Sequence, residues 1–534
     1  MRIVSAQEMR SVDESAFRRL GIPSFAVMES AGRAVVSVLM RCAPELSHVD
    51  VLCGPGNNGG DGYVIGRVLR DLGVDVDLFS TSEPTSKDAI LAASAFRASG
   101  GTVQSLSTYL PRPDSIVIDA LFGFGFGGSG FRGSLDDELS GVSRSIEHAR
   151  ATARVRVLAV DVPSGVDATL GTAALSCITA DWTVTFQYPK RGHFLFPAAE
   201  KRGELFVVDI GVGEQGEFKE SIADIPQIEA FARRSFHVGA DAHKGTKGHV
   251  FVVGGSEGCY GAPLLSARAA LRLGAGLVTI GLSRQAEALL TESLGELMSL
   301  VIWDESQDLD ARAKLTEFVD RRLGKLSSLV IGPGLGLGDR SATIARAILR
   351  IARERDIPTV IDADGLSLIA AREDLWGDLP PRTVLTPHPG EMARLLNTTS
   401  EKIQADRFGA ARTLSTDRQC WVILKGAHSV VAHPSGECSV VPVSAPALAT
   451  AGSGDILAGV LGSLLSRSDA FGEDVILGAT LHAYAGKRFA EHPVGVVASD
   501  LVPTIADVAN DLISFEQAVT PDFPVLAIYP AVPS

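Results

Sequence analysis

Residues 452–465 read GSGDILAGVLGSLL, a glycine-rich turn followed directly by an apolar stretch long enough to form a helix. Glycines let the backbone turn tightly, and the first N–H groups of the helix then face any anion that lies before it. The charge of Asp455 would repel a phosphate, but its carboxylate suits a base that takes a proton from a hydroxyl beside a phosphoryl group. A simple N-terminal cap fits these residues equally well, so the stretch alone leaves both interpretations open.

The apolar runs around this helix predict two separate α/β sheets, each wound with helices between its strands. The runs before the helix lie at 249–253, 277–280, 328–331, 359–362, 383–386 and 421–424, and long helices are expected at 453–466 and 474–490. An earlier series lies at 48–53, 74–79, 115–119, 156–161, 182–186 and 204–210, with leading helices at 6–19 and 24–41 and a helix from Tyr63 to about Leu72. A polar, acidic stretch at 213–224 separates the two series. We therefore expect a first domain over 1–213, a linker over 214–229 and a second domain over 230–534.

Length, charge and cysteine content narrow the class of protein. The chain has 534 residues, 46% of them apolar, and a formal charge of -14, which disfavours a nucleic acid or an anionic membrane as its partner. Its six cysteines form no CxxC pair, so they suggest neither a disulfide framework nor a zinc site. No apolar run is long enough to span a membrane, and the N-terminus has no signal-peptide core. A cytoplasmic protein is expected.

Three loops of the first half follow predicted strands and contain polar side chains. The loop GPGNNGGDG (54–62) matches the dinucleotide fingerprint only formally, because no acidic residue ends the next strand. Asp119 and Asp161 each end a strand, and Ser164 follows closely after Asp161. Ligands bind beyond the carboxyl ends of such strands, so we expect Asn58, Asp119 and Ser164 to converge there. Their oxygen atoms suit K⁺, Na⁺ or Mg²⁺, although each aspartate alone also fits a helix cap or a turn.

The motifs NNGGDG (57–62), DALFGFGFGG (119–128) and DVPSGVD (161–167) resemble the NAD(P)H-hydrate epimerase family, and the stretches 20–32 and 185–192 are similar to it as well. The resemblance implies a Rossmann-like three-layer sandwich that interconverts the R and S forms of NAD(P)H hydrated at C6 of the nicotinamide ring. It also implies potassium at Asn58, Asp119 and Ser164, and Asp161 at the reacting centre. The implied substrate-binding residues are Asn57, Asn58, Gly59, Gly60, Asp61, Gly123, Phe124, Gly125, Phe126, Gly127, Gly128, Ser129 and Asp161. Our hypothesis gives Asp161 the acid/base role in the loss and return of the hydroxyl group.

Four further loops in the second half lie at predicted strand ends and would line one edge of its sheet: GPGLG (332–336), DADG (362–365), TPHPGE (386–391) and KGAHS (425–429). The chain contains no GxxxxGK[ST], so phosphate is not held by a P-loop. Taken singly, His388 also fits a hydrogen bond within its loop, and Lys425 fits a solvated charge.

Together with the glycine-rich helix start, these loops resemble the ribokinase-like fold and, more narrowly, the ADP/ATP-dependent NAD(P)H-hydrate dehydratase family. The resemblance implies phosphorylation of the C6 hydroxyl of the S form and loss of phosphate, at the expense of ADP or ATP and with Mg²⁺. Asp455 would accept the hydroxyl proton. The implied contacts with the hydrate are Ala262, Gly334, Gly336, His388 and Asp455, and those with the adenine nucleotide are Lys425, Gly426, Ala427, His428, Ser429 and Gly454. Family precedent also implies a homo-oligomer.

Two other functions fit part of the sequence. A ribokinase-like kinase of a small alcohol or vitamin precursor, joined to a first domain that binds without catalysis, would share the fold and the Gly-x-Gly-Asp helix start. TPHPGE and the intact Asp119 and Asp161 weigh against it. A dinucleotide oxidoreductase would show redox turnover of NAD(P).

Overall fold

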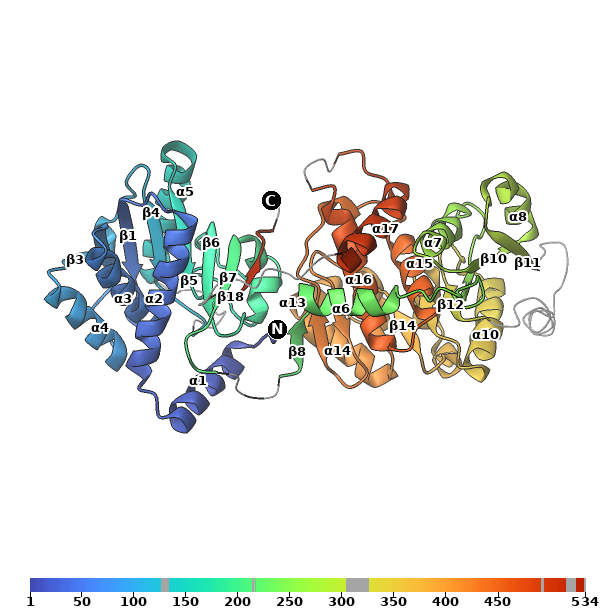
Figure 1. Ribbon diagram of the computed structural model, residues 1–534, viewed down its shortest axis with the longest axis horizontal. Coiled ribbons are helices and arrows are strands. Elements are labelled where there is room, and N and C mark those ends of the chain that lie inside the picture. Colours follow the sequence, from blue (N-terminus) through green and yellow to red (C-terminus); the bar gives the residue numbers. More distant parts are fainter. Residues whose placement is uncertain are drawn as a thin grey trace. The chain divides into compact units, whose positions relative to one another are not determined.

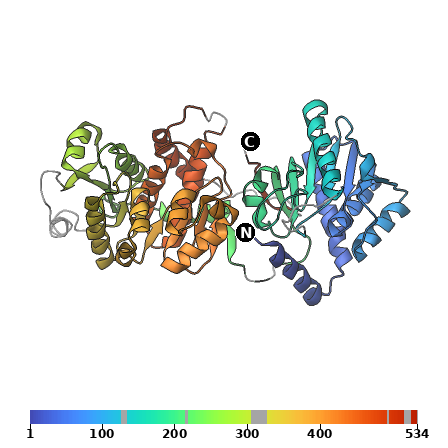
Figure 2. The same ribbon diagram turned by 180° about the vertical axis from the view of Figure 1, so that it is seen from behind.

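The chain folds into two compact units, one formed by Met1–Glu220 with Val519–Ser534 and the other by Ser221–Ala518. This computed structural model describes residues 1–125, 134–213, 216, 218–303, 326–490, 494–514 and 525–532, without the side chains of 134–138 and 291. Each unit is built around one sheet that is mainly parallel, and helices cover both faces of each sheet (Figures 1 and 2). The predicted fold class, two α/β domains, is therefore confirmed.

The sheet of the first unit contains parallel strands in the winding that the apolar runs predict. Its strands are, in spatial order, β18 (Val525–Tyr529), β7 (Glu204–Val208), β6 (Trp182–Phe186), β5 (Arg156–Val160), β4 (Ile116–Ala120), β1 (His48–Cys53), β2 (Asp75–Ser80) and β3 (Val103–Ser105). Its helices are α1 (Ala6–Leu20), α2 (Ser24–Cys42), α3 (Asn57–Asp71), α4 (Lys87–Ala98) and α5 (Ser134–Ala153).

Alternation along the strands sends side chains to two different helix layers. Val49 and Val51 of β1 pack with α1, α2, α3 and α4, whereas Leu52 packs on the opposite face with α5. In β4, Ile116 and Ile118 likewise join the first layer and Val117 joins the second. Because side chains alternate between the faces of a strand, these buried runs produce the three-layer sandwich that the family resemblance implies.

The last strand, β18, belongs to the first unit although it follows the whole second unit in the chain. It pairs antiparallel with β7, with Tyr529 opposite Leu205 (Figure 1). Arg202, which is 1% exposed, donates hydrogen bonds to the carbonyl groups of Tyr529 and Pro530, at 3.4 and 3.1 Å. The expected second domain over 230–534 is therefore wrong at its C-terminal end. Strand β18 belongs to the first unit, because it pairs with β7 and covers an edge of the first sheet.

A chain that ends at Ser514 is expected to have a less stable first unit. The truncation exposes the edge of β7 and removes two acceptors from the buried Arg202. Hydrogen bonds to a charged group are worth roughly 1.5–3 kcal/mol each, so the unit should lose about 3 kcal/mol or more. Thermal unfolding would show this as an earlier first-unit transition, whereas a control ending at Val532 keeps both acceptors and should unfold like the full chain. Equal transitions in both proteins would contradict the stabilising role of β18.

The sheet of the second unit is larger and has antiparallel strands at one edge. In spatial order its strands are β11 (Met298–Trp303), β10 (Leu277–Ser283), β9 (His249–Val253), β12 (Ser328–Ile331), β13 (Thr359–Ile361), β14 (Thr383–Leu385), β15 (Trp421–Leu424), β16 (Val430–Ala432), β17 (Cys438–Val440) and β8 (Glu220–Ile222). The helices are α6 (Ile225–Ser235), α7 (Gly261–Arg272), α8 (Arg284–Leu290), α10 (Asp339–Glu354), α11 (Asp364–Ala371), α12 (Pro389–Leu395), α13 (Ser400–Ala405), α14 (Arg407–Arg418), α15 (Ser453–Leu465), α16 (Phe471–Lys487) and α17 (Ala498–Ser514).

Helix α15, which begins with the glycine-rich turn, lies at the centre of the second unit. Leu457 and Leu461 pack against the sheet strands, and Ile456 and Val460 pack against α6, α16 and α17. The helix is apolar on all sides because it lies between the sheet and a second layer of helices. Its N-terminus is therefore held firmly relative to the strand ends.

The expected linker over 214–229 is wrong in its second half. Strand β8 joins the edge of the ten-stranded sheet, where the amide of Ala223 donates to the carbonyl of Val440 at 2.9 Å. Helix α6 follows, and the Asp224 side chain caps it by accepting a hydrogen bond from the amide of Gln227. Its apolar face, which includes Ile228 and Phe231, is buried against α16 and α17. The acidic stretch before α6 obscured this amphipathic pattern.

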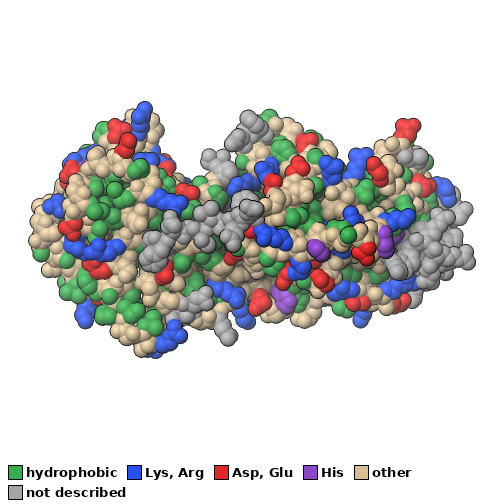
Figure 3. Space-filling model, viewed as in Figure 1, with side chains coloured by type: hydrophobic (Ala, Val, Ile, Leu, Met, Phe, Trp, Pro, Cys, Tyr) green, Lys and Arg blue, Asp and Glu red, His purple; other side chains and the backbone are tan. Residues whose placement is uncertain are grey.

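None of the helices in the described residues is both long enough and apolar enough to cross a membrane. On the face of the molecule in Figure 3, acidic and basic side chains are interspersed among the described residues of both units.

Candidate active sites

The first candidate site lies where β1, β4 and β5 end. These strands are parallel neighbours, so the loops that follow Cys53, Ala120 and Val160 meet at one edge of the sheet. A Cβ atom on Gly54 would lie 1.8 Å from the carbonyl oxygen of Leu121, so only glycine lets these loops approach so closely. The predicted convergence of the three loops is confirmed.

The Asn-Gly segment forms the start of a helix and not a loop. Helix α3 begins at Asn57, six residues before the predicted start at Tyr63, and Gly56 caps it without a side-chain hydrogen bond. Glycine is required at position 59, because a Cβ atom there would lie 1.8 Å from the carbonyl oxygen of Gly54. The absence of side chains from Gly59 and Gly60 thus lets the helix start tightly against β1, which places Asn58 and Asp61 near the strand ends.

A pocket of about 690 Å³ opens over these strand ends. The predicted substrate-binding residues that line it are Asn57, Asn58, Asp61, Gly123, Phe124, Gly125 and Asp161, and Lys190 lines it as well. Helix α1 covers the pocket with Met9, Arg10, Asp13, Glu14 and Phe17. Gly59 and Gly60 pack beneath it, against Gly54 and Met28. The predicted residues Phe126, Gly127, Gly128 and Ser129 lie outside the described residues.

Asp161 is held at the pocket floor by a buried cation. The Lys190 ammonium group, which is fully buried, donates to Oδ1 of Asp161 at 2.6 Å. Thr185 also donates to Oδ1, at 3.0 Å, and the amide of Phe124 donates to Oδ2 at 2.9 Å. Burial opposes the charge of Asp161, but Lys190 outweighs it and lowers the pKa of the carboxyl group. Asp161 is therefore a fixed anion near neutral pH.

Asp119 and Ser164 contact each other below the pocket. The hydroxyl and the amide of Ser164 donate to Asp119, at 2.6 and 2.8 Å, and burial raises the pKa of Asp119 to about 6. Asn58 lies in the same region, since a Cβ atom on Gly123 would be 2.8 Å from its Oδ1. The buried Nδ2 of Asn58 has no hydrogen-bond partner in the described part of the chain. The Asp119 carboxylate, the Ser164 hydroxyl and the amide oxygen of Asn58 are oxygen atoms of the kind that fits a hard cation such as K⁺.

Sequence reasoning assigned no role to Lys190, His193 or Asp13. His193 accepts a hydrogen bond from the amide of Lys190 through Nδ1, and its Nε2 is 3.0 Å from the carbonyl oxygen of Asp161. Burial and the nearby Lys190 lower the pKa of His193 to about 3, so the ring is neutral. The sequence feature that could have indicated a role for Lys190 is its position in the segment Gln187–Lys190, which directly follows a buried strand. Asp13 gave no such signal, because it lies on an amphipathic helix far from any strand end.

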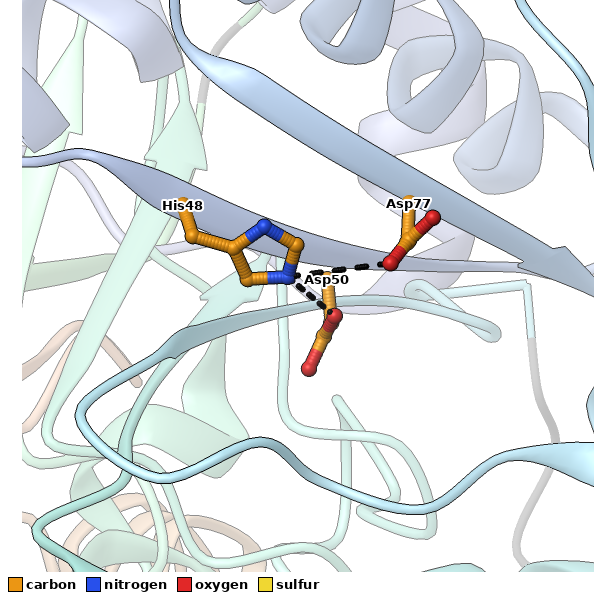
Figure 4. Close-up of side chains that lie close together, drawn as sticks. All are labelled: His48, Asp50 and Asp77. Atoms are coloured by element: carbon orange, nitrogen blue, oxygen red, sulfur yellow. Dashed lines mark hydrogen bonds and ion pairs between the residues drawn. The ribbon is translucent and has the colours of Figure 1, made fainter.

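A second group of ionisable side chains lies at the amino ends of the strands of the same sheet, away from the pocket (Figure 4). His48, at the start of β1, lies 2.9 Å from Asp50 and 3.9 Å from Asp77. Arg112 forms an ion pair with Asp77, and Asp75 accepts from His48 at 2.9 Å. The carboxylates are thus engaged by the His48 ring and the Arg112 guanidinium group, and we interpret the group as a structural network.

The second candidate site lies at the carboxyl ends of β9, β12, β13, β14 and β15, which are parallel neighbours. The predicted loops of this unit therefore lie along one edge of the sheet. Gly334 has a φ of +60°, and a Cβ atom there would be 2.5 Å from the carbonyl oxygen of Cys259 and 3.3 Å from Ala262. The amide of Gly336 donates to Asp364 at 2.8 Å. The structure thus brings Ala262 and the GPGLG glycines together.

The start of α15 contacts an ion pair between the partly exposed Lys425 and the buried Asp362. Lys425 donates to Oδ1 of Asp362 at 2.7 Å and lies 3.8 Å from Glu391. A Cβ atom on Gly454 would lie 3.2 Å from the Lys425 ammonium nitrogen and 3.3 Å from Oδ2 of Asp362, so glycine allows the helix to begin directly above the pair. Burial opposes the charge of Lys425, but Asp362 and Glu391 outweigh it and raise the pKa of the ammonium group.

Asp455 does not cap its helix. Gly452 is the capping residue, with a φ of +90°, and no side chain makes a capping hydrogen bond. The backbone of Asp455 is held by the Ser266 hydroxyl, which donates to its carbonyl oxygen at 2.8 Å. Burial and the nearby Asp362 raise the pKa of Asp455 to about 7, whereas Lys425 lowers it. The capping interpretation is therefore excluded, and the carboxyl group has the pKa of a useful base at neutral pH.

His388 makes the hydrogen bonds within its loop that the sequence allowed, and its contact with the hydrate stays a prediction. Its Nδ1 accepts hydrogen bonds from the amides of Gly390 and Glu391, at 3.0 and 3.3 Å, and Glu391 accepts from the His388 amide at 2.8 Å. This capping box begins α12 and fixes the imidazole. Burial and Lys425 lower the pKa of His388, which is consistent with a neutral ring that accepts at Nδ1. The side chain remains 52% exposed, at the same sheet edge as Asp362 and Lys425.

The segment Lys425–Ser429 is supported from below by Arg407, which sequence reasoning missed. The buried guanidinium group donates to the carbonyl oxygens of Leu424, Lys425 and His428. The Ser429 hydroxyl donates to the carbonyl oxygen of Gly426 at 3.3 Å. The His428 side chain is buried, so it belongs to the support of this segment more than to its open face.

Family models match both halves of the chain: one for the YjeF-related protein N-terminus covers residues 24–192, and one for NAD(P)H-hydrate dehydratase covers residues 250–507. The bifunctional NAD(P)H-hydrate repair enzyme Nnr of Moorella thermoacetica is 35% identical over 529 residues, which is 96% of this chain and 97% of that protein. The chain belongs to the bifunctional NAD(P)H-hydrate repair enzyme family. The enzyme of the same name from Escherichia coli is 30% identical, over 95% of this chain and 93% of that protein.

Among solved structures, the ADP/ATP-dependent NAD(P)H-hydrate dehydratase of Bacillus subtilis, co-crystallized with ATP/Mg²⁺, is 26% identical to this chain. The match covers 55% of this chain and 98% of that one, with a TM-score of 0.46. The strand ends that form the first candidate site lie within residues 24–192, and those that form the second lie within residues 250–507, so each family model covers one of the two sets of strand ends.

Proposed function

We propose that this member of the repair-enzyme family epimerises the R and S hydrates of NAD(P)H in its first unit and dehydrates the S form in its second. The observation that supports this division is the presence of two separate carboxylates, Asp161 and Asp455, each at the carboxyl ends of its own parallel sheet. One unit supplies the epimer that the other consumes, so a mixed pool of hydrates can be repaired completely.

In the first unit, the hydrated nicotinamide ring would lie in the pocket above Asp161. The amides of Asn57 and Asn58 and the backbone at Gly123–Gly125 offer donors and acceptors for its polar groups. The fixed anion Asp161 favours positive charge that develops on the ring as the C6 hydroxyl group departs. Asn58, Asp119 and Ser164 would hold K⁺, whose charge would complement the buried Asp119 carboxylate.

In the second unit, Asp455 would take the proton of the C6 hydroxyl group while a phosphoryl group is transferred to it. The N-terminus of α15 at Gly454 and the ammonium group of Lys425 would face the phosphoryl oxygens. Segment Lys425–Ser429 would contact the adenine nucleotide, ADP or ATP. Asp362 and Glu391 provide carboxylate oxygens of the kind that Mg²⁺ prefers when it accompanies a nucleotide.

Incubation of the protein with a mixture of R and S hydrates and ADP or ATP tests the proposal. Both epimers should be converted completely to NAD(P)H, with phosphate released, and the absorbance of the reduced nicotinamide would follow the reaction. Conversion of the S fraction alone would refute the epimerase assignment. A phosphorylated product that accumulates without elimination would instead support the small-alcohol kinase alternative.

The dehydration rate is expected to rise with pH through the pKa of Asp455, which burial and Asp362 raise to about 7. A base must be ionised to accept a proton, so kcat/KM should rise roughly tenfold per pH unit well below this pKa and level off above about pH 8. Initial rates with the S hydrate at saturating nucleotide would show the profile. A dehydration rate that does not change between about pH 5 and pH 8 would contradict a base with this pKa.

A further inference from the structure

The pocket of the first unit contains a second carboxyl group, that of Asp61, whose hydrogen bonding differs from that of Asp161. Asp61 lies in the first half of α3, lines the pocket and is 8% exposed. Among the described residues, none donates a hydrogen bond to its carboxyl group, whereas Asp161 accepts several. Asp61 is thus a buried acid whose oxygens are not engaged by donors from that part of the chain.

Asp161, by contrast, has little capacity left to move a proton. Three donors from the described residues converge on it: the Lys190 ammonium, the Thr185 hydroxyl and the Phe124 amide. Lys190 is equally constrained, since its three N–H groups meet Asp161 at 2.6 Å, Thr185 at 2.9 Å and the carbonyl of Phe186 at 3.3 Å. Protonation of Asp161 would break a fully buried ion pair, which is costly.

The surroundings of Asp61 favour its neutral form. Burial raises the pKa of Asp61 well above its usual value, and the nearby carboxylates of Asp161 and Asp13 raise it further. The charged side chains that line the same pocket are Arg10, Asp13, Glu14, Asp88, Asp161 and Lys190. Lys190 is already paired with Asp161, and among the described residues Asp61 forms no ion pair. The surroundings thus favour the neutral form of Asp61 and the charged form of Asp161 within one pocket.

We propose that Asp61 is the proton donor and acceptor of the epimerisation, and that the ion pair of Asp161 with Lys190 provides the fixed field in which it works. This inference rests on the proposed epimerase function of the first unit. The sequence hypothesis gave the acid/base role to Asp161 and expected Asp61 only to bind substrate. The proposal assigns that role to Asp61 instead.

The chemistry balances without any oxidant or reductant. The C6 hydroxyl group and the ring nitrogen share one carbon, so neutral Asp61 donates its proton to the hydroxyl and the C6–O bond breaks with its electron pair leaving on water. The lone pair of the ring nitrogen forms a C=N bond, and Asp161 stabilises the resulting cation. Once the planar cation has turned its other face toward Asp61, water adds to that face of C6, the C=N electron pair returns to nitrogen, and the Asp61 carboxylate takes the proton of the incoming water.

Substitution of Asp61 by Asn and by Glu tests the proposal. The Asn side chain keeps the shape but cannot donate an acidic proton, so kcat for epimerisation should fall by about 100-fold or more, with KM changed little. The Glu variant keeps an acid and should retain more activity than the Asn variant. Epimerisation is measured in the full chain with a purified S hydrate and without ADP or ATP, so that the dehydratase is idle, and the uncatalysed rate is subtracted.

Asp71→Asn, at the exposed end of the same helix, is the matched control and should epimerise like the wild type. Dehydration by the second unit and the thermal transition of the first unit verify that each variant is folded. The proposal is overturned if the Asn variant keeps the wild-type kcat, or if it is at least as active as the Glu variant, as expected for a packing role. A wild-type protein that does not epimerise would refute the proposed function itself.

Discussion

Asp455→Asn is expected to abolish nucleotide-dependent dehydration of the S hydrate and to leave epimerisation unchanged. The substitution keeps the size of the side chain at the start of α15 but removes the base that accepts the hydroxyl proton. General-base catalysis contributes about 10²- to 10⁴-fold, so kcat should fall at least about 100-fold. NADH formation from the S hydrate would measure the loss, and exchange between R and S without nucleotide would measure the retained activity.

Asp417→Asn provides the control for this experiment. Asp417 is an exposed residue of α14, in the same unit, and its replacement should leave both reactions unchanged. Binding of the adenine nucleotide to the Asp455 variant should also persist, because Lys425–Ser429 and Gly454 remain in place. The expected loss is at least about 100-fold. A variant that dehydrates at more than about a tenth of the wild-type rate would therefore show that Asp455 is not the base.

Asp161→Asn is expected to eliminate epimerisation and also to destabilise the first unit. The variant leaves the Lys190 ammonium group fully buried with no carboxylate partner. Breaking a buried ion pair by removing one partner costs about 3–5 kcal/mol, so the first unit should unfold at a markedly lower temperature. Calorimetry would record the unfolding, and the S-to-R exchange assay would record the activity. Dehydration of the S hydrate by the second unit should continue.

The double variant Asp161→Asn/Lys190→Met separates the two effects. Methionine removes the unpaired charge and fills similar volume, so most of the lost stability should return, whereas the epimerase activity should not. If stability and activity are restored together, the ion pair only supports the fold. If the single variant is as stable as the wild type, the Lys190 ammonium is not held as the structure indicates.

Much of both sheets could be predicted from local sequence. Strands such as 249–253 and 328–331 have the predicted bounds, because a strand buried on both faces is a continuous apolar run with a polar residue at its start. The convergence of Asp119 with Ser164 followed from the parallel order of their strands. The start of α3 was placed too late, because Gly59 and Gly60 are poor helix formers and only close packing on β1 makes them suitable there.

Contacts between segments far apart in the chain could not be predicted in this way. Asp13 belongs to the pocket only because α1 folds over the strand ends. Arg407 supports Lys425 from the start of another helix, and nothing near it in sequence indicates this. The short edge strand β8 is formed by Glu220, Ser221 and Ile222, whose composition resembles a linker and becomes a strand only through pairing with β17. Tertiary contacts decide such positions.

The position of β18 also affects how the protein is synthesised. A ribosome completes β7 at Val208 but does not reach Val525, which begins the partner strand, until it has translated the whole of the second unit. At about 5–20 residues per second, the edge of β7 stays unpaired for roughly 15–60 s during translation of each chain. Such an edge can pair with other nascent chains. Chaperone binding to nascent chains is therefore expected to persist after the first unit has left the ribosome and to end only on chain release.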